Sequence, residues 1–433
     1  MSRWHRIDRV IKWLYPGIRV KRWIALSGAS AIVFVIGLFR LFELSRYLEM
    51  IYPSSTVYSY LSAALLMLLG IGGISFGINR VARTIVRGIS PGKEGQASEI
   101  LYHKQRLSKG PQVVTVGGGT GLSTLLRGLK RFTSNLTAVV TVMDDGGSSG
   151  RIREELDLLP PGDIRNCLIA LAEDESKISE LFQHRFKDGK DLVGHSLGNL
   201  FIAGMQQITG SFDVAIEETS KILATRGQVL PATLEQVNLV AEMEDGDHLT
   251  GESALTRDPR RIRQISLSKT PVLPYAKVVT EIRDADIIVL GPGSLFTSLI
   301  PNLLIENVSR EIERARAVKL YVLNLMTQPG ETDGFTARDH LRTLNDYITM
   351  STFDVVIVNT DPIPAELLEH YRAENAIPVY DDLDGNELGL EVIRAGLLDV
   401  VELEGKPTVK HKPEVLAQAI RTAWSSRSKG MWI

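Results

Sequence analysis

A glycine-rich turn separates an apolar, β-branched run from a stretch with helical periodicity. The run Val113–Val116 leads directly into Gly-Gly-Gly-Thr-Gly, and a helix is predicted over Leu122–Phe132. Glycines let the backbone approach an anion, and the free N–H groups at the start of a helix attract phosphate. The predicted phosphate-binding residues are Gly117, Gly118, Gly119, Thr120, Gly121 and Ser123.

Two other interpretations of this turn stay open. A tight strand-to-helix turn needs glycines even when it binds nothing. A dinucleotide-binding protein would also have a glycine turn here, but its last glycine would come one residue later than Gly121 does. The lysine of a P-loop is missing from the turn as well.

Two adjacent aspartates, Asp144 and Asp145, follow the second predicted strand, Ala138–Val142. Paired carboxylates at the end of a strand suit a divalent cation or a ribose hydroxyl. An Asx turn that caps a helix would account for one aspartate but not for both. Glycines, hydroxyls and an arginine come next and offer donors to a second phosphate. These predicted donors are Gly146, Gly147, Ser148, Ser149 and Arg151.

A third aspartate, Asp163, begins the predicted helix Asp163–Ala172. Its plainest role is to cap that helix. Taken with the aspartate pair Asp144 and Asp145, it is a candidate metal ligand. Arg165 and Asn166 follow closely, and we expect them to face the same cleft as phosphate or nucleotide contacts.

Three more polar turns complete the set of candidates. His195 is a candidate acid–base group or phosphate donor, although a lone histidine is more often structural, and Asn199 is a candidate base or ribose contact. A second glycine–hydroxyl turn follows the predicted strand Ile287–Leu290, and an amide-rich turn follows Leu320–Leu323. From these two turns we predict ligand contacts at Gly291, Gly293, Ser294 and Thr327.

Several classes of chemistry are disfavoured. The sequence has no Gly-x-Ser-x-Gly elbow and no His-Glu-x-x-His motif. Its single cysteine, Cys167, rules out a disulfide or a cysteine-based zinc site within one chain. The formal net charge of -2 gives no electrostatic reason to bind nucleic acid, so no nucleic-acid partner is predicted.

The elements that must position these residues alternate between strands and helices. The fifth predicted strand is Val355–Val358, and a further helix is predicted over Asn307–Ala317. The strands are apolar on both faces, which predicts an α/β fold with a three-layer, doubly wound, mostly parallel, Rossmann-like sheet. Ligands bind at the carboxyl ends of the strands of such a sheet, where all these turns lie. The stretch Gly227–Ser268 is predicted to be a small β-rich insert or an edge of the sheet.

Two long apolar stretches, 23–42 and 57–78, precede this part and predict two transmembrane helices. Lysines and arginines flank their outer ends, so the N-terminus and the globular part are expected in the cytoplasm of a multi-pass cell-membrane protein. A cleaved signal peptide and two buried helices of a soluble protein are the alternatives. The predicted organisation is a membrane anchor over 1–87, a linker over 88–110 and a nucleotide-binding domain over 111–425.

The order of the motifs is more specific than any one of them. Gly-Gly-Gly-Thr-Gly-Leu-Ser, Asp-Asp-Gly-Gly-Ser-Ser-Gly-Arg, Leu-Pro-Pro-Gly-Asp-Ile-Arg-Asn, Gly-His-Ser-Leu-Gly-Asn-Leu, Leu-Gly-Pro-Gly-Ser-Leu and Met-Thr-Gln-Pro-Gly-Glu-Thr follow one another along the chain. This series resembles the YvcK/CofD-like family, and the resemblance covers residues 112–421. The family includes the YvcK-type gluconeogenesis factors and, more distantly, the 2-phospho-L-lactate transferase CofD.

The resemblance implies more than the motifs do. YvcK-type proteins are associated with UDP-N-acetylglucosamine binding and with cell shape during growth on gluconeogenic carbon. CofD transfers a phospholactyl-type group from a guanosine diphosphate donor to a flavin-like alcohol and uses Mg²⁺. By resemblance, Asp144, Asp145 and Asp163 lie near such a metal, and Tyr371 and Lys410 contact the nucleotide.

The sequence departs from the family pattern in three places. Phe296 stands where the family usually has tyrosine, so a hydroxyl contact is lost. Lys410 stands where the family usually has arginine, and a lysine cannot make the two-pronged grip of a guanidinium. The apolar hairpin is absent from typical soluble members.

The leading hypothesis is a membrane-tethered regulatory protein that binds a nucleotide sugar and influences envelope synthesis, cell shape or central carbon use. A magnesium-dependent, CofD-like transferase is the rival, and a dinucleotide-binding protein is the third alternative. The expected ligands are a UDP-sugar and Mg²⁺. The expected partners are the membrane, through residues 23–78, a second copy of the chain, and proteins of envelope synthesis.

Overall fold

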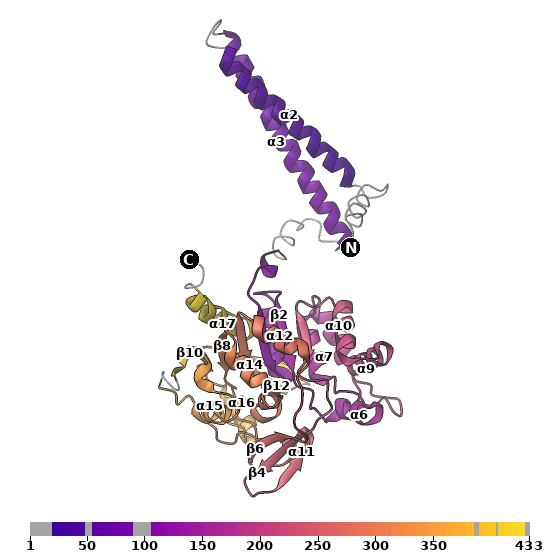
Figure 1. Cartoon of the computed structure of the whole chain (residues 1–433), viewed down its shortest axis with the longest axis vertical. Helices are drawn as coiled ribbons and strands as arrows, with labels where there is room; N and C mark the ends of the chain where they lie inside the picture. The colour runs from indigo at the N-terminus through magenta and orange to yellow at the C-terminus, as the bar shows by residue number, and fades with distance from the viewer. Residues whose placement is uncertain (1–19, 48–53, 90–104, 385–388, 404–405, 429–433) are drawn as a thin grey trace. The chain divides into compact units, whose positions relative to one another are not determined.

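The computed structural model describes residues 20–47, 54–89, 105–384, 389–403 and 406–428 (Figure 1). The chain divides into two compact units, Met1–Arg106 and Leu107–Ile433. Most of the basic residues that precede the first apolar stretch, and most of the predicted linker, lie outside the described residues. Each unit is therefore described by itself.

The first unit contains two long helices, α2 (Val20–Tyr47) and α3 (Ser54–Ile89), which pack along each other (Figure 1). Both are long and apolar enough to cross a membrane, with a mean hydropathy of 2.1 over Val20–Phe42 and over Tyr60–Thr84. Small residues allow the close packing. A Cβ atom on Gly73 would lie 2.1 Å from the Ser30 hydroxyl oxygen, and one on Gly77 would lie 2.1 Å from that of Ser27.

The helix α3 is longer than predicted. The sequence predicts that the second span ends at residue 78 and that the linker begins at 88, but α3 continues to Ile89. Gly88 does not end the helix, because one glycine costs only about 1 kcal/mol in a helix of this length. The guanidinium of Arg80, beyond the predicted span, lies over the rings of Trp23 and Phe76.

The second unit is built on a seven-stranded sheet in which every neighbouring pair is parallel. The strand order is β10-β9-β8-β7-β1-β2-β3. Chain connections run outward in opposite directions from β1 and β7, which makes the gap between these two strands the topological switch point. The strands are β1 (Val113–Gly117), β2 (Leu136–Val140), β3 (Gln228–Pro231), β7 (Ile287–Leu290), β8 (Val318–Val322), β9 (Val355–Asn359) and β10 (Glu391–Ala395).

Helices cover both faces of the sheet, which gives three layers. Alternate strand residues point to opposite faces, so Val113 joins one apolar core and Val114 the other. The first core contains side chains of α5 (Gly119–Leu129), α7 (Gly162–Leu171), α9 (Leu197–Thr209), α10 (Phe212–Ile222) and α17 (Pro413–Ser428). The second contains side chains of α12 (Ala276–Asp284), a π-helix (Leu295–Leu299), α13 (Ile300–Leu303), α14 (Val308–Arg314) and α15 (Ala337–Asn345). The helix α8 (Glu175–Gln183) adds Phe182 to the first core, and a 3-10 helix (Met350–Thr352) adds Met350 to the second. Two further helices are α6 (Gly147–Leu156) and α16 (Ala365–Ala373).

Two small β-structures lie outside the main sheet. The first, which we call the insert, is the antiparallel sheet of β4 (Leu239–Met243), β5 (His248–Thr250) and β6 (Ile262–Leu267) with the short helix α11 (Glu252–Arg257). Figure 1 shows it beyond one end of the sheet. The second is the ribbon of β11 (Leu398–Leu403) and β12 (Lys406–His411).

The predicted fold class is confirmed, and all five predicted strands belong to the sheet. Strand and helix ends differ from the predictions by a few residues. The stretch Gly227–Ser268 contains both predicted alternatives, because β3 is an edge strand of the main sheet and the rest forms the insert. The short strand β10 was not predicted, and β3 was predicted only as part of the stretch Gly227–Ser268.

Candidate functional site

The glycine turns that follow β1 and β7 lie back to back at the switch point. A Cβ atom on Gly121 would lie 2.5 Å from the carbonyl oxygen of Pro292, which is closer than any real contact. Only glycine therefore fits where the two turns meet. This close approach brings the start of α5 and the start of the π-helix to one place.

A pocket of about 500 Å³ opens at this point. A volume of this size is typical of sites for small molecules. Nine of the predicted ligand contacts line it, namely Gly118, Gly119, Thr120, Gly121, Gly293, Ser294, Thr327, Tyr371 and Lys410. The loop Asn324–Glu331, the edge of β12 and two residues of α11, Glu252 and Thr256, complete its wall. No sequence pattern pointed to Glu252 and Thr256, because a six-residue helix in an insert has no periodicity to detect.

The start of α5 is partly occupied by the protein itself. The N–H of Gly119 donates a hydrogen bond of 2.7 Å to the carboxylate of Asp163. Among the residues that the structure describes, the N–H groups of Thr120 and Gly121 have no partner, as expected of the first turn of a helix. Both residues line the pocket. An incoming phosphate would therefore find these two donors, with the Asp163 carboxylate beside them.

The second glycine turn holds a buried carboxyl group of the protein. The buried carboxylate of Glu331 accepts hydrogen bonds from the hydroxyls of Ser294 and Thr297 at the start of the π-helix. Burial raises the pKa of Glu331, and the hydrogen bonds from Ser294, the Phe296 N–H and Thr297 oppose that shift. The N–H of Gly293 donates to the side-chain oxygen of Asn324 at 3.3 Å. In this structure the predicted phosphate donors Gly293 and Ser294 are thus engaged within the protein.

The three predicted metal ligands are not gathered into one set. Asp145 turns to the insert, where its carboxylate accepts the N–H of Ser253 at 2.7 Å at the start of α11. Within the described ranges, no group of three His, Cys, Asp or Glu side chains has an arrangement that would hold a metal ion. The Mg²⁺ prediction stays open in a narrower form, since Mg²⁺ is often held by one or two carboxylates and the phosphates of a ligand.

The acids that remain near the pocket raise one another's pKa values. Burial raises the pKa of Asp163 to about 6, and the charge of Asp144 adds to the effect. Burial also raises the pKa of Asp144. The pKa of Glu252 rises to about 9 through burial and then through the charges of Asp144, Asp163, Glu331 and Asp145. Glu252 is therefore protonated at neutral pH and can donate a hydrogen bond into the pocket.

Five of the other predicted contacts, Ser148, Arg165, Asn166, His195 and Asn199, form a separate network that is largely buried. The guanidinium of Arg165 donates to Asn199, Ser196 and Asn166, and the side chain of Asn199 donates to Ser148 at 3.0 Å. Ser148 is also 3.0 Å from the Nδ1 of His195. The network ties α6, α7 and α9 together below the turn that contains the aspartates.

Burial shifts the pKa values of the ionisable side chains in this network. It lowers the pKa of Arg165 to about 10 and lowers the pKa of His195, so the histidine is neutral at pH 7. The nitrogen Nε of Arg165 is buried and has no partner among the described residues.

The following predicted contacts do not line the pocket: Gly117, Ser123, Gly146, Gly147, Ser148, Ser149, Arg151, Arg165, Asn166, His195, Asn199 and Gly291.

The ribbon and α16 form the far wall of the pocket. The hydroxyl of Tyr371 accepts the N–H of Val409 at 3.0 Å, which fixes the ring against β12. Burial lowers the pKa of Lys410, and the charge of Arg127 lowers it further. Phe296 does not reach this wall, because its ring is buried in the core and packs edge-on against Phe335. The replacement of tyrosine at this position therefore concerns packing.

The fold and the site define a class of protein. It is an α/β protein with a Rossmann-like parallel sheet and a pocket at the topological switch point, where glycine turns and free helix N–H groups meet. The sequence profile of the family described as 2-phospho-L-lactate transferase CofD matches residues 113–398. The chain belongs to this CofD family, within which it is similar to the gluconeogenesis factors.

Some relatives match nearly the whole chain, and others match only about two thirds of it. The gluconeogenesis factor of Bacillus subtilis is 50% identical over 66% of this chain and 90% of its own length. A relative from a Nostoc species is 42% identical over 96% of this chain and 93% of its own length. An alignment of that extent includes residues of the apolar hairpin.

A solved structure matches the second unit. A Bacillus halodurans protein is 46% identical and has a TM-score of 0.69, and the match covers 72% of this chain and 100% of that chain. That protein folds without a counterpart of the first unit. The fragment Leu107–Ile433 is therefore expected to fold by itself.

Proposed function

We propose that the protein is a membrane-tethered regulatory protein that binds a nucleotide sugar in the switch-point pocket. The observation that carries the proposal is that Thr120 and Gly121, whose N–H groups have no partner among the described residues, line a pocket of about 500 Å³. A diphosphate at these donors would leave the nucleoside or the sugar against the wall of Tyr371 and Lys410. Among the described residues of the pocket, no side chain is set up as a covalent nucleophile, which disfavours turnover through a covalent intermediate on the protein.

The proposed ligand is UDP-N-acetylglucosamine, on the resemblance to YvcK-type proteins. The pocket is acidic on the side of Asp163 and Glu252, so a diphosphate bound there needs a positive charge to offset its own negative charge. Mg²⁺ carried by the diphosphate would supply it, with Asp163 or Asp144 as a protein ligand. Protonated Glu252 is suited to donate a hydrogen bond to a phosphate or sugar oxygen.

Calorimetric titration of the fragment Leu107–Ile433 with UDP-N-acetylglucosamine tests the proposal. Binding should be tighter with Mg²⁺ than without it. Lys410→Ala should weaken binding by about tenfold, because the ammonium faces the pocket. Lys406→Ala, an exposed lysine at the other end of the same strand, should leave it unchanged. No heat in either buffer would contradict the proposal.

The tether and the cellular role belong to the same proposal. The helices α2 and α3 have the length and composition of membrane spans. With both spans inserted, the basic residues at their outer ends favour a cytoplasmic second unit. A cytoplasmic nucleotide-sugar sensor held at the membrane would be well placed to regulate envelope synthesis, cell shape or central carbon use.

A transferase is the second candidate function, and membership of the CofD family favours it. In that case Mg²⁺ would neutralise a diphosphate donor, and a substrate alcohol would attack phosphorus in line and expel the nucleotide. The two candidates are distinguished by turnover. A product that forms with the native protein and not with Asp144→Asn, while nucleotide binding persists, would establish the transferase.

A further inference from the structure

One edge of the main sheet offers unpaired backbone groups. In the parallel pair of β2 and β3, Val140 lies opposite Pro231, and the N–H of Ala232 donates to Val140 at 2.8 Å. Since alternate residues of a strand point to opposite sides, the N–H and C=O of Val229 and the C=O of Pro231 point away from β2. No partner for these three groups occurs in the part of the chain that the structure describes. Proline fits this outward position because it has no N–H to leave unpaired.

These groups face a groove of about 360 Å³, which we call the edge groove. One wall is a face of α10, from which Asp213 and Glu217 line the groove at the spacing of one helical turn. The other wall is Tyr275 and Lys277 at the start of α12, on the opposite face of the sheet. The floor is β3 itself. The edge groove lies two strands away from β1, and none of its lining residues belongs to the switch-point pocket.

Lys221 and Lys277 also line the edge groove, but among the described residues neither makes an ion pair with the carboxylate of Asp213. Asp213 accepts hydrogen bonds from the hydroxyls of Ser211 and Tyr275, the latter at 3.2 Å. No ion pair to Asp213 occurs among the described residues, whereas Lys221 on the same helix is bound to both Glu217 and Glu218 at 2.8 Å. A half-buried carboxylate held only by hydroxyls in a concave site is suited to receive a positive charge.

We propose that the edge groove binds an extended peptide segment that adds a strand beside β3 and places a lysine or arginine side chain at Asp213. The backbone of the peptide would pair with Val229 and Pro231, which gives affinity without regard to sequence. The contact with Asp213 would supply the selectivity. A peptide of a few residues fits a groove of about 360 Å³, and the short strand with its proline prevents longer pairing.

Fluorescence anisotropy with short labelled peptides tests this inference on the full chain in detergent. The probe is acetyl-Thr-Val-Lys-Val-Thr-amide, and the matched peptide carries glutamate in place of lysine. The lysine peptide should bind and the glutamate peptide should not. Asp213→Asn should weaken binding of the lysine peptide by about tenfold, because a charged hydrogen bond is lost. Glu218→Gln, on the same helix and paired with Lys221, should leave it within about twofold.

A second measurement does not depend on a protein variant. A lysine peptide that is N-methylated at its central backbone amides cannot pair with β3 and should bind at least about tenfold more weakly. The inference would be overturned by equal binding of the lysine and glutamate peptides, or by indifference to N-methylation. It would also be overturned if cross-linking joined Lys277 to a second copy of the chain across the edge groove.

Discussion

Two carboxylates of the protein accept hydrogen bonds at the helix starts where the sequence predicts phosphate binding. Asp163 holds the N–H of Gly119, and Glu331 holds the hydroxyls of Ser294 and Thr297. Carboxylates at such positions make the hydrogen bonds that a phosphate would otherwise make. The glycine turns are therefore kept in shape without a ligand, and among the described residues the N–H groups of Thr120 and Gly121 remain available to bind one.

Glu252 should make the stability of the second unit depend on pH. Its pKa in the folded protein is about 9, above the ordinary value of 4.5. Between these two pH values, the folded state keeps a proton on Glu252 that the unfolded state has lost. Stability should therefore fall as the pH rises from about 4.5 to about 9. Glu252→Gln should remove this part of the decline, which denaturation with guanidinium at about pH 5 and about pH 9 would measure.

Glu369→Gln is the matched control for this experiment, because Glu369 is exposed on α16. It should leave the pH profile as it is in the native protein. If Glu252→Gln left the profile unchanged as well, Glu252 would be ionised at neutral pH and could not donate a hydrogen bond into the pocket.

Tyr321 should be replaceable by phenylalanine with a gain in stability. Its ring is fully buried in β8, and its hydroxyl has no partner among the described residues. A buried polar group without a hydrogen bond costs free energy, so Tyr321→Phe should raise the free energy of unfolding by about 1 kcal/mol. Chemical denaturation of the fragment Leu107–Ile433 measures the change.

The control for this variant is Tyr347→Phe. The hydroxyl of Tyr347 accepts the N–H of Ile265 at 3.0 Å, so its removal should lower the stability by about 1 kcal/mol. Equal losses for the two variants would mean that Tyr321 has a hydrogen-bond partner in solution, such as a buried water molecule.

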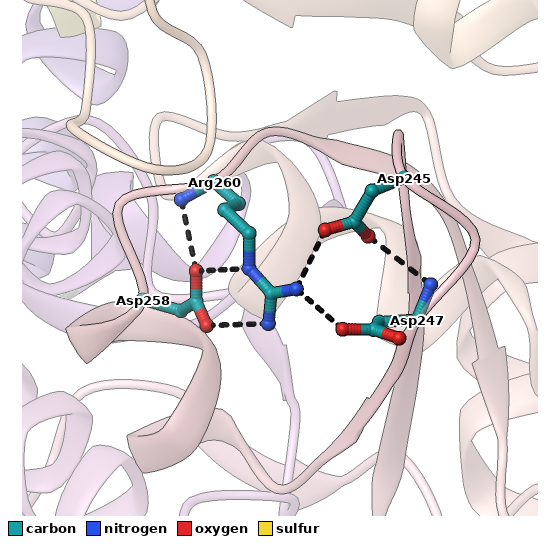
Figure 2. Close-up of polar contacts among 4 residues, drawn as sticks. All are labelled: Asp245, Asp247, Asp258 and Arg260. Atoms are coloured by element: carbon teal, nitrogen blue, oxygen red, sulfur yellow. Dashed lines mark hydrogen bonds and ion pairs between the residues drawn. The ribbon is translucent and has the colours of Figure 1, made fainter.

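At the scale of elements, one arginine holds the insert together. Figure 2 shows the guanidinium of Arg260 between Asp258, which follows α11, and the β4–β5 turn with Asp245 and Asp247. The hydrogen bonds to these aspartates raise the pKa of Arg260. Because α11 contains Glu252, this cluster helps to determine where the wall of the pocket lies.

Arg260→Ala should loosen the insert and leave the main sheet intact. Hydrogen exchange should become faster in β5 and α11 and stay slow in β1 and β7, because the cluster joins only parts of the insert. Arg263→Ala is the control, since Arg263 makes a single ion pair with Glu242 within the same small sheet. Unchanged exchange in α11 for Arg260→Ala would mean that the hydrogen bond from Ser253 to Asp145 holds the helix alone.

The sequence predicts the central elements better than the edges. Ile287–Leu290 was predicted with the observed bounds, because a strand buried on both faces is an uninterrupted apolar run. The edge strand β3 is short and contains a proline, so nothing in its composition distinguishes it from a loop.

Side-chain directions were the part of the site that the sequence could not supply. Motif spacing places Asp144, Asp145 and Asp163 at one edge of the sheet, but it does not reveal that Asp145 turns to α11. Nor does it reveal that Arg165 is committed to Asn199 and Ser196, since these contacts join segments far apart in the chain. The wall formed by Glu252 depends on how the insert folds back, which is a tertiary property.

At the scale of the whole molecule, the first unit should decide where the protein is found. Within the helices of the hairpin, only 6% of the apolar window of α2 and 17% of that of α3 are buried. Such apolar surface is stable in a bilayer and unfavourable in water. The full chain should therefore stay with membranes after an alkaline carbonate wash, and Leu107–Ile433 should be soluble. Release of the full chain by carbonate would contradict the tether.

The central claim is that a diphosphate binds at the start of α5 in the switch-point pocket. A crystal structure of the fragment Leu107–Ile433 soaked with UDP-N-acetylglucosamine and Mg²⁺ tests it most directly. We expect a phosphate within hydrogen-bond distance of the N–H groups of Thr120 and Gly121, with the rest of the ligand against Tyr371 and Lys410. A ligand found elsewhere, or a pocket that stays empty at saturating concentration, would contradict it.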